Sequence, residues 1–304
     1  MRARPEDRLI RSAVLEWLRR LTLRFGDALP WAELKRGVEV DGRNVQVIGP
    51  QGIFTPAGLD IPISITTAPL KPGQAPPYED RIEDDGMLSY RYRGTDPRHR
   101  DNVGLRRAYT ETVPLVYFHG IAKGIYQAFW PVFIHADDPG SLTCTIAFED
   151  PQVLRADLTP MIVDEARRSY VSRLARQRLH QAAFRYRVIT AYASTCAVCQ
   201  LRHVELLDAA HILPDNHPMG TPVVSNGLSL CKIHHAAYDA NILGIRPDSV
   251  VEIRSDILDE IDGPMLRHGL QERHGGILVA PRRSVDRPNR EFLAERYEVF
   301  SSAR

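Results

Sequence analysis

The sequence is poor in cysteine and in lysine, and its acidic and basic residues almost cancel. Among its 304 residues there are 4 cysteines, and the net charge is +1. So few cysteines exclude a disulfide-stabilised scaffold and indicate a reducing compartment, so we expect a cytoplasmic protein. A net charge near zero excludes a uniformly basic nucleic-acid-binding protein. Any DNA-binding surface must therefore come from local clusters of arginine, the basic residue that dominates this sequence.

Long apolar runs are also missing. The most apolar stretch, residues 113–136, is interrupted by histidine, lysine, glutamine and glycine, and therefore predicts strands and a turn rather than a membrane span. The N-terminus carries Glu6 and Asp7 and has no continuous apolar segment, so we expect no signal peptide. The sequence also contains no internal repeat and no low-complexity segment.

What is present is an ordinary globular composition, with 43% hydrophobic and 25% charged residues. A chain of this length is expected to form two domains. A proline-containing segment, residues 151–163, predicts the linker between them. We therefore expect an α+β protein with an N-terminal domain in residues 1–150 and a C-terminal domain in residues 164–304.

The N-terminal domain is expected to combine one helix with many short strands. Apolar residues at helical spacing predict a packing helix over residues 5–25. Residues 95–106 are polar and rich in arginine and indicate a surface loop. Cys144, far from the other three cysteines, is expected to be buried on a strand. The strand candidates are the β-rich runs 38–42, 44–49, 60–66, 113–118, 126–134 and 142–148.

A long helix is predicted directly before the other cysteines. Residues 163–192 place apolar side chains on one stripe and many arginines around it. The pattern is compatible with contact to DNA, with pairing of two subunits and with a solvated face. We expect this helix to connect the two domains.

The densest chemistry lies between residues 196 and 239. Cys196 and Cys199 form one close pair of metal-binding residues, and Cys231 and His234 form a second, each with two residues between its members. Two such pairs on a segment that folds back can close a tetrahedral zinc site. We therefore predict a structural Zn²⁺ held by these four residues. The alternatives are buried thiols without metal, and a zinc module that binds nucleic acid without catalysis.

Three further residues are interleaved with the zinc pairs. His211 lies near the end of an apolar, strand-like run, Asn226 follows a proline-containing loop, and His235 comes directly after His234. This order resembles the HNH endonucleases, whose core is the ββα-metal fold. The resemblance implies that His211 is the general base, that Asn226 orients it and that His235 ligates one divalent ion, Mg²⁺ or Mn²⁺. An imidazole suits a base because it titrates near neutral pH.

The pattern departs from that family at one position. Many HNH enzymes have an acidic metal ligand directly before the first histidine, where this sequence has Ala210. The nearest acid is Asp208, which we expect to be a second ligand of the divalent ion. On a regular strand Asp208 and His211 point to opposite faces, so a bend or bulge would be needed. We also expect a helix over about 227–239 that carries ligands of both metal ions.

The N-terminal half resembles another family, through less specific motifs. Residues 35–150 are similar to the SRA-like readers of modified cytosine in the segments 52–65, 88–102 and 113–133. The resemblance implies an SRA/PUA-like barrel that flips a modified cytosine out of the duplex and stacks it on aromatic rings, while an acid reads its amine. The alternative is that the aromatic residues fill a β core. The candidates for this base pocket are Tyr90, Tyr92, Asp101, Tyr117 and Trp130.

Together the two resemblances imply a restriction-type DNA endonuclease. Its substrate would be double-stranded DNA that carries 5-methylcytosine or 5-hydroxymethylcytosine. One centre of this kind cuts one strand, so a homodimer is the expected assembly for a double-strand break. Two other functions fit the same residues: an HNH nuclease that does not depend on modification, and a zinc-dependent DNA-binding protein without enzymatic activity.

Overall fold

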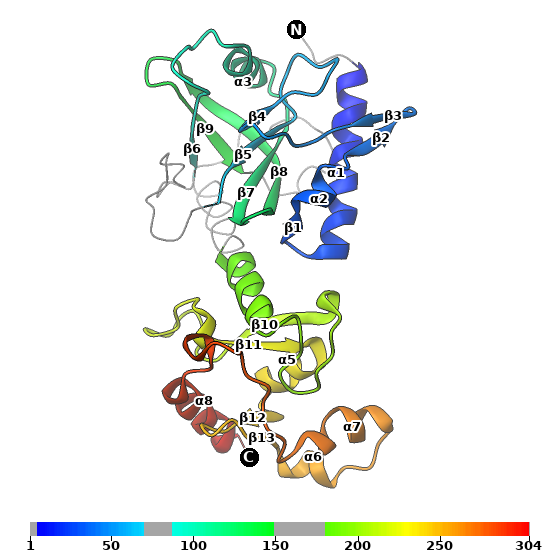
Figure 1. Ribbon diagram of the computed structural model, residues 1–304, viewed down its shortest axis with the longest axis vertical. Helices are drawn as coiled ribbons and strands as arrows, with labels where there is room; N and C mark the ends of the chain where they lie inside the picture. Colours follow the sequence, from blue (N-terminus) through cyan, green and yellow to red (C-terminus); the bar gives the residue numbers. More distant parts are fainter. Residues whose placement is uncertain (1–4, 70–86, 149–179, 304) are drawn as a thin grey trace. The chain divides into compact units, whose positions relative to one another are not determined.

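The computed structural model in Figure 1 describes residues 5–69, 87–148 and 180–303. The chain divides into two compact units, residues 1–182 and 183–304. The predicted linker and most of the predicted connecting helix lie outside the described residues, so the domain boundaries stay predictions. Within the described part of the chain, no helix has the length and apolar character needed to cross a membrane.

Within its described residues, the N-terminal unit contains strands of 2 to 14 residues and the helices α1, α2 and α3. Its elements are α1 (Pro5–Phe25), β1 (Leu29–Pro30), α2 (Trp31–Leu34), β2 (Val38–Val40), β3 (Arg43–Val45), β4 (Ile53–Phe54), β5 (Ser64–Thr67), β6 (Leu88–Arg91), α3 (Arg100–Thr110), β7 (Leu115–Ala122), β8 (Ile125–Asp138) and β9 (Thr143–Phe148). The predicted helix over residues 5–25 is confirmed, and each predicted strand run contains or overlaps a strand. Cys144 is buried on β9, as predicted.

Seven of these strands form one curved sheet in the order β4-β5-β7-β8-β9-β6, with β1 paired to the start of β8. The β5–β7 pair is parallel and the other pairs are antiparallel, while β2 and β3 form a separate hairpin. Register shifts along β8 accompany its curvature, because a bulge increases the bend of a strand. The α+β class is therefore confirmed, and closure into an SRA/PUA-like barrel stays a prediction.

Alternate residues of the central strands enter two separate apolar cores. On β7, Tyr117 packs into the first core and Phe118 into the second, because successive side chains of a strand point to opposite faces. Residues of α3 complete the first core, and residues of α1 and α2 complete the second. Val14 and Leu18 of α1 are fully buried, so the N-terminal helix has the packing role that its apolar stripe predicted.

Helix α3 occupies part of the segment that was predicted to be a surface loop, and that prediction was wrong. The buried amide of Asn102 donates to the carbonyl oxygens of Arg93 and Asp96 and accepts from the backbone nitrogen of Arg93, which fastens the start of the helix to the preceding turn. Leu105 and Ala108 then pack into the first core. The polar, arginine-rich composition describes only the exposed face of the helix.

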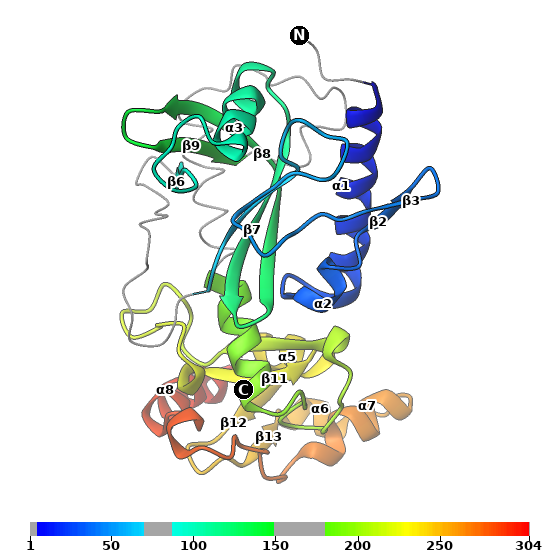
Figure 2. The same cartoon turned by 45° about the horizontal axis from the view of Figure 1, so that its top comes forward.

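The C-terminal unit begins within a helix over residues 180–191 and contains two small hairpins surrounded by short helices (Figure 2). Its elements are η2 (Val204–Leu206), β10 (Leu207–His211), η3 (Val224–Asn226), β11 (Gly227–Cys231), α5 (Lys232–Asp239), β12 (Leu243–Ile245), β13 (Val251–Ile253), α6 (Ser255–Asp259), α7 (Pro264–Gly269), η4 (Gln271–Arg273), η5 (Ser284–Asp286) and α8 (Arg290–Ser302). A single apolar core joins the helix over 180–191 to both hairpins and α8.

Strands β10 and β11 pair antiparallel, and α5 follows β11 directly, which gives the order ββα. The predicted helix over about 227–239 was wrong in its first part, because residues 227–231 are β11. All five residues of this strand are buried. A strand buried on both faces has no alternation of apolar and polar residues, so it cannot be told from a buried helix by its pattern.

Candidate functional site

Four metal-binding side chains gather at one end of the ββα unit. Cys196 and Cys199 lie in a turn ahead of β10, Cys231 ends β11, and His234 lies in the first turn of α5. Their ligand atoms all lie within 4.8 Å of one another. The hairpin brings these distant parts of the sequence together, because its outer rung pairs Leu207 of β10 with Cys231.

The spacing of these atoms fits a tetrahedral zinc ion. The Sγ atoms of Cys199 and Cys231 are 3.9 Å apart, and Nδ1 of His234 lies 3.1 Å from Sγ of Cys231 and 3.5 Å from Sγ of Cys196. Neighbouring ligands of tetrahedral zinc are about 3.5–3.8 Å apart, given bonds of about 2.3 Å to sulfur and 2.0 Å to nitrogen. Nε2 of His234 is 2.7 Å from the carbonyl oxygen of Gly269, which orients Nδ1 toward the thiols.

The pKa values of the cysteine thiols also favour a bound cation. Hydrogen bonds with Cys199 and Cys231 lower the pKa of Cys196, whereas hydrogen bonds with Cys196 and Cys231 raise the pKa of Cys199. Without a cation the cluster therefore favours one thiolate and keeps a neighbour protonated. A dication stabilises several thiolates at once, and zinc binding releases their protons. The three thiols and one imidazole can thus hold a structural zinc ion.

His211 lies at the other end of the hairpin, on the rung that pairs it with Gly227. Its imidazole stacks on the buried ring of Phe184, with ring centroids 4.0 Å apart and an interplanar angle of 14°. Nε2 of His211 lies 3.0 Å from Oδ1 of Asp215 but does not have the geometry of a hydrogen bond with it. Burial lowers the pKa of His211, Asp215 opposes that effect, and the nearby His235 adds to it. A neutral imidazole at pH 7 can accept a proton.

Asn226 contacts the chain next to His211. Its fully buried amide donates to the carbonyl oxygens of Leu213 and Thr221, at 3.0 and 3.1 Å, and accepts from the backbone nitrogen of Leu213 at 2.9 Å. The backbone carbonyl oxygen of Asn226 accepts a hydrogen bond from the backbone nitrogen of Ile212 at 2.9 Å. These bonds fix the loop that leaves β10 directly after His211, so an orienting role for Asn226 would act through the backbone.

His235 and Asp208 face each other between α5 and β10. Nδ1 of His235 is 3.8 Å from Oδ2 of Asp208, and Nε2 is 3.4 Å from Oδ2 of Asp239. The Asp208 carboxylate raises the pKa of His235, and His235 lowers the pKa of Asp208. Strand β10 keeps an unbroken register with β11, so the bend or bulge considered for Asp208 and His211 does not occur within this strand. An imidazole and a carboxylate placed in this way can share a divalent ion.

Three residues beside this site were missed by sequence reasoning: Phe184, Arg185 and Asp215. Arg185 donates to the backbone carbonyl oxygens of Val204 in η2 and Leu207 in β10. Its Nε lies 3.6 Å from Oδ1 of Asp208. Asp215 lies in a loop four residues after His211. Its negative charge and its short separation from His211 are the sequence signals that could have identified it as a neighbour. Phe184 was only one apolar residue of a helical stripe, and nothing in the stripe identifies its partner.

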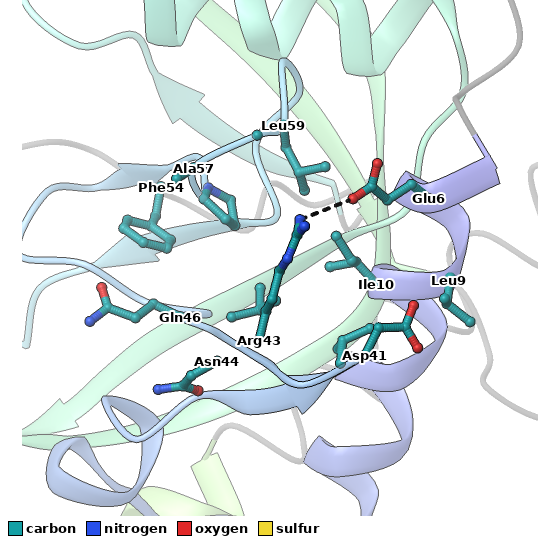
Figure 3. Close-up of a pocket in the computed structure, with 14 residues that line it drawn as sticks. Glu6, Leu9, Ile10, Asp41, Arg43, Asn44, Gln46, Phe54, Ala57 and Leu59 are labelled. Atoms are coloured by element: carbon teal, nitrogen blue, oxygen red, sulfur yellow. Dashed lines mark ion pairs between the residues drawn. The ribbon is translucent and has the colours of Figure 1, made fainter.

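The N-terminal unit contains a cavity of about 1070 Å³ between α1, the β2–β3 hairpin and the segment after β4, shown in Figure 3. Arg43 extends across it toward Glu6, with 3.8 Å between Nη1 and Oε1. Ile10, Phe54 and Leu59 supply apolar surface. Polar side chains, among them Asp41, Asn44 and Gln46, also line it.

The residues predicted for a base pocket do not line this cavity. Tyr90, Tyr92 and Tyr117 are buried in the first core, where their hydroxyl groups hydrogen bond to neighbouring residues. Trp130 packs against the second core, on the opposite face of the sheet. Asp101, at the start of α3, forms an ion pair of 2.7 Å with Arg93. In this conformation the five side chains do not share one surface.

Residues 196–246 match the model of the HNH endonuclease family. A solved structure described as "Modification dependent TagI restriction endonuclease" matches with 16% identity and a TM-score of 0.29, over 78% of this chain and 81% of that chain. The search of curated proteins found no match. The family match includes both zinc pairs, β10, β11 and α5.

Proposed function

The chain carries an HNH endonuclease domain in residues 196–246, and we propose that it is a DNA endonuclease that hydrolyses phosphodiester bonds. One observation carries this proposal: the family match falls on the ββα unit that holds His211, Asn226 and His235. The zinc cluster lies at one end of its hairpin and His211 at the other. The hairpin is thus held at the end remote from the proposed base.

In the proposed reaction, His211 accepts a proton from the attacking water. Burial favours its neutral form, and Asn226 fixes the loop beside it. His235 and Asp208 would hold one divalent ion, Mg²⁺ or Mn²⁺, which supplies positive charge to the phosphate and to the leaving oxygen when it is bound. Zn²⁺ on the cysteine cluster would be structural, because all four of its positions are filled by protein ligands.

We further propose that the N-terminal unit makes cleavage depend on 5-methylcytosine or 5-hydroxymethylcytosine in double-stranded DNA. The support for this step is the resemblance of residues 35–150 to the SRA-like readers. Tyr90, Tyr92, Asp101, Tyr117 and Trp130 remain the sequence-based candidates for contact with the base. Cleavage of both strands by one centre per chain would require a homodimer or two encounters.

The test is cleavage of three matched plasmids that carry methylated, hydroxymethylated or unmodified cytosine, with Mg²⁺ or Mn²⁺ added. The proposal expects cleavage of at least one modified plasmid and little cleavage of the unmodified one. Equal cleavage of all three would leave an HNH nuclease that does not depend on modification.

A second function is favoured by the zinc cluster alone. A zinc-dependent DNA-binding protein would need the four ligands but no general base. It would bind DNA equally well as wild type and as His211→Ala, and the wild type would cut none of the plasmids with any divalent ion. Cleavage that disappears in His211→Ala while binding persists would exclude it.

A further inference from the structure

The helix over residues 180–191 contacts the hairpin along its length although it lies outside the HNH match. Arg185 donates to the carbonyl oxygen of Leu207 at 2.6 Å, where β10 begins. Arg187 donates to the carbonyl oxygen of Pro222 at 2.8 Å, in the loop between the strands. The helix therefore holds both the start of the hairpin and the loop near the proposed base.

Directly before Arg185 on this helix, Phe184 lies against the imidazole of His211. The rings are nearly parallel, and Phe184 is 2% exposed whereas the side chain of His211 is 19% exposed. One face of the imidazole is thus covered by a fixed apolar ring. A planar neighbour at this distance restricts rotation of the imidazole about its Cβ–Cγ bond, because a turned ring would collide with it.

The hairpin has room for this ring because the partner of His211 on β11 is Gly227. A Cβ atom at residue 227 would lie 2.8 Å from Cζ of Phe184 and 2.4 Å from Cγ2 of Val188. Tyr192 also donates to the carbonyl oxygen of Gly227, at 3.2 Å. The helix therefore fills the space that the missing side chain leaves beside His211.

From this geometry we infer that Phe184 is a positioning residue, which sets the plane of the His211 imidazole and so the direction of its ring nitrogens. The inference rests on the proposed nuclease function. If Phe184 has this role, the functional site includes a helix that lies outside the residues matched by the HNH family model. A proton acceptor must point at its water within narrow limits, and a misplacement of about 1 Å can reduce a rate by roughly 100-fold.

The test compares two Phe→Leu variants of the full chain. Phe184→Leu removes the stacked ring, and Phe300→Leu makes the same change at a fully buried position on α8 that packs against Gly244. The single-turnover cleavage rate on bound DNA is measured with DNA affinity, zinc content and melting temperature. We expect Phe184→Leu to lose roughly 10- to 100-fold in rate with DNA affinity and zinc content unchanged. Phe300→Leu should lose stability but keep its rate.

A rate for Phe184→Leu equal to that of the wild type would overturn the inference, and so would an equal loss of rate in Phe300→Leu. NMR of histidine-labelled protein supplies a readout that needs no activity. The Phe184 ring shifts the ring protons of His211 upfield, so these signals should move downfield in Phe184→Leu and stay in Phe300→Leu. Signals that do not move in Phe184→Leu would also contradict the stack. If the wild type cuts no DNA, the proposed function fails, and these signals still test the contact.

Discussion

Two adjacent histidines on α5 serve two regions of the C-terminal unit that differ in almost every respect. His234 is 2% exposed, its Nδ1 lies among thiols, and its Nε2 bonds to a backbone carbonyl oxygen. The side chain of His235 is 27% exposed and lies near two carboxylates. Successive residues of a helix point about 100° apart, so neighbours can face different surroundings. The proposed division of roles, with His234 as a structural ligand and His235 as a ligand of the catalytic ion, therefore depends on surroundings and not on residue type.

The same contrast holds for the two ends of the β10–β11 hairpin. At the Cys231 end the polar atoms contact one another within a closed cluster. At the His211 end one imidazole face is covered, and its Nε2 makes no hydrogen bond within the described residues. A closed cluster favours stability, whereas an incompletely satisfied group is typical of a site that awaits a substrate.

Replacement of each histidine in turn tests the contrast most severely. His234→Ala should lose zinc and unfold the C-terminal unit, because a structural zinc ion supplies about 10 kcal/mol or more of folding free energy in small domains. His235→Ala should keep its zinc and its melting temperature but lose cleavage that depends on Mg²⁺ or Mn²⁺. Native mass spectrometry and thermal unfolding measure both outcomes. Zinc loss in His235→Ala would show that the two regions are not separate.

Removal of the proposed base should affect the rate and little else. His211→Ala is expected to slow cleavage by about 10²- to 10⁴-fold, the usual contribution of a general base, with zinc content and DNA affinity unchanged. His217→Ala is the matched control, since His217 forms an ion pair with Glu295 at 2.9 Å. The control should cleave at the wild-type rate. A His211→Ala variant that cleaves normally would remove this residue from the mechanism.

Asn226→Ala should weaken the fold near His211 more than the loss of an ordinary helix cap. The change leaves the backbone groups of Leu213 and the carbonyl oxygen of Thr221 without their buried partner, at an expected cost of about 2–3 kcal/mol. Asn289→Ala removes the cap of α8 and should cost about 1 kcal/mol. Urea unfolding compares the two variants. A cost for Asn226→Ala no larger than that of the cap would contradict the bridging role.

The smallest effect is expected at Asp208. In Asp208→Asn the amide keeps the size of the side chain but loses its charge beside His235, so about tenfold more Mg²⁺ should be needed for the half-maximal rate. The zinc content should stay the same, since Asp208 is not among the four ligands of the cluster. An unchanged Mg²⁺ requirement would assign the second ligand position to water or to another residue.

The sequence predicted those parts of the fold and site that depend on fixed spacing. The two pairs Cys196/Cys199 and Cys231/His234 identify a potential zinc cluster because ligand spacing is set by the local chain geometry. The helix over residues 5–25 followed from its apolar period. Ligand spacing and helical periodicity involve residues close together in the chain, so they can be recognised in a single sequence.

What could not be predicted depends on contacts between distant residues. The stack of Phe184 on His211 joins a helix to a strand, and no spacing within either element indicates it. The start of α3 depends on the bonds of Asn102 to the turn before it, which composition does not reveal. The sequence predicts the start of a helix where β11 forms, because burial on both faces removes the alternation of apolar and polar residues.

Strand β8 has a consequence for how the N-terminal unit comes apart. Phe129 belongs to the first core and Ala128 to the second, while the same strand bonds to β7 along one edge and to β9 and β1 along the other. Loss of β8 would therefore disrupt both cores at once. The unit should lose its structure in a single cooperative transition, and a protease should degrade it as a whole rather than trim it one layer at a time.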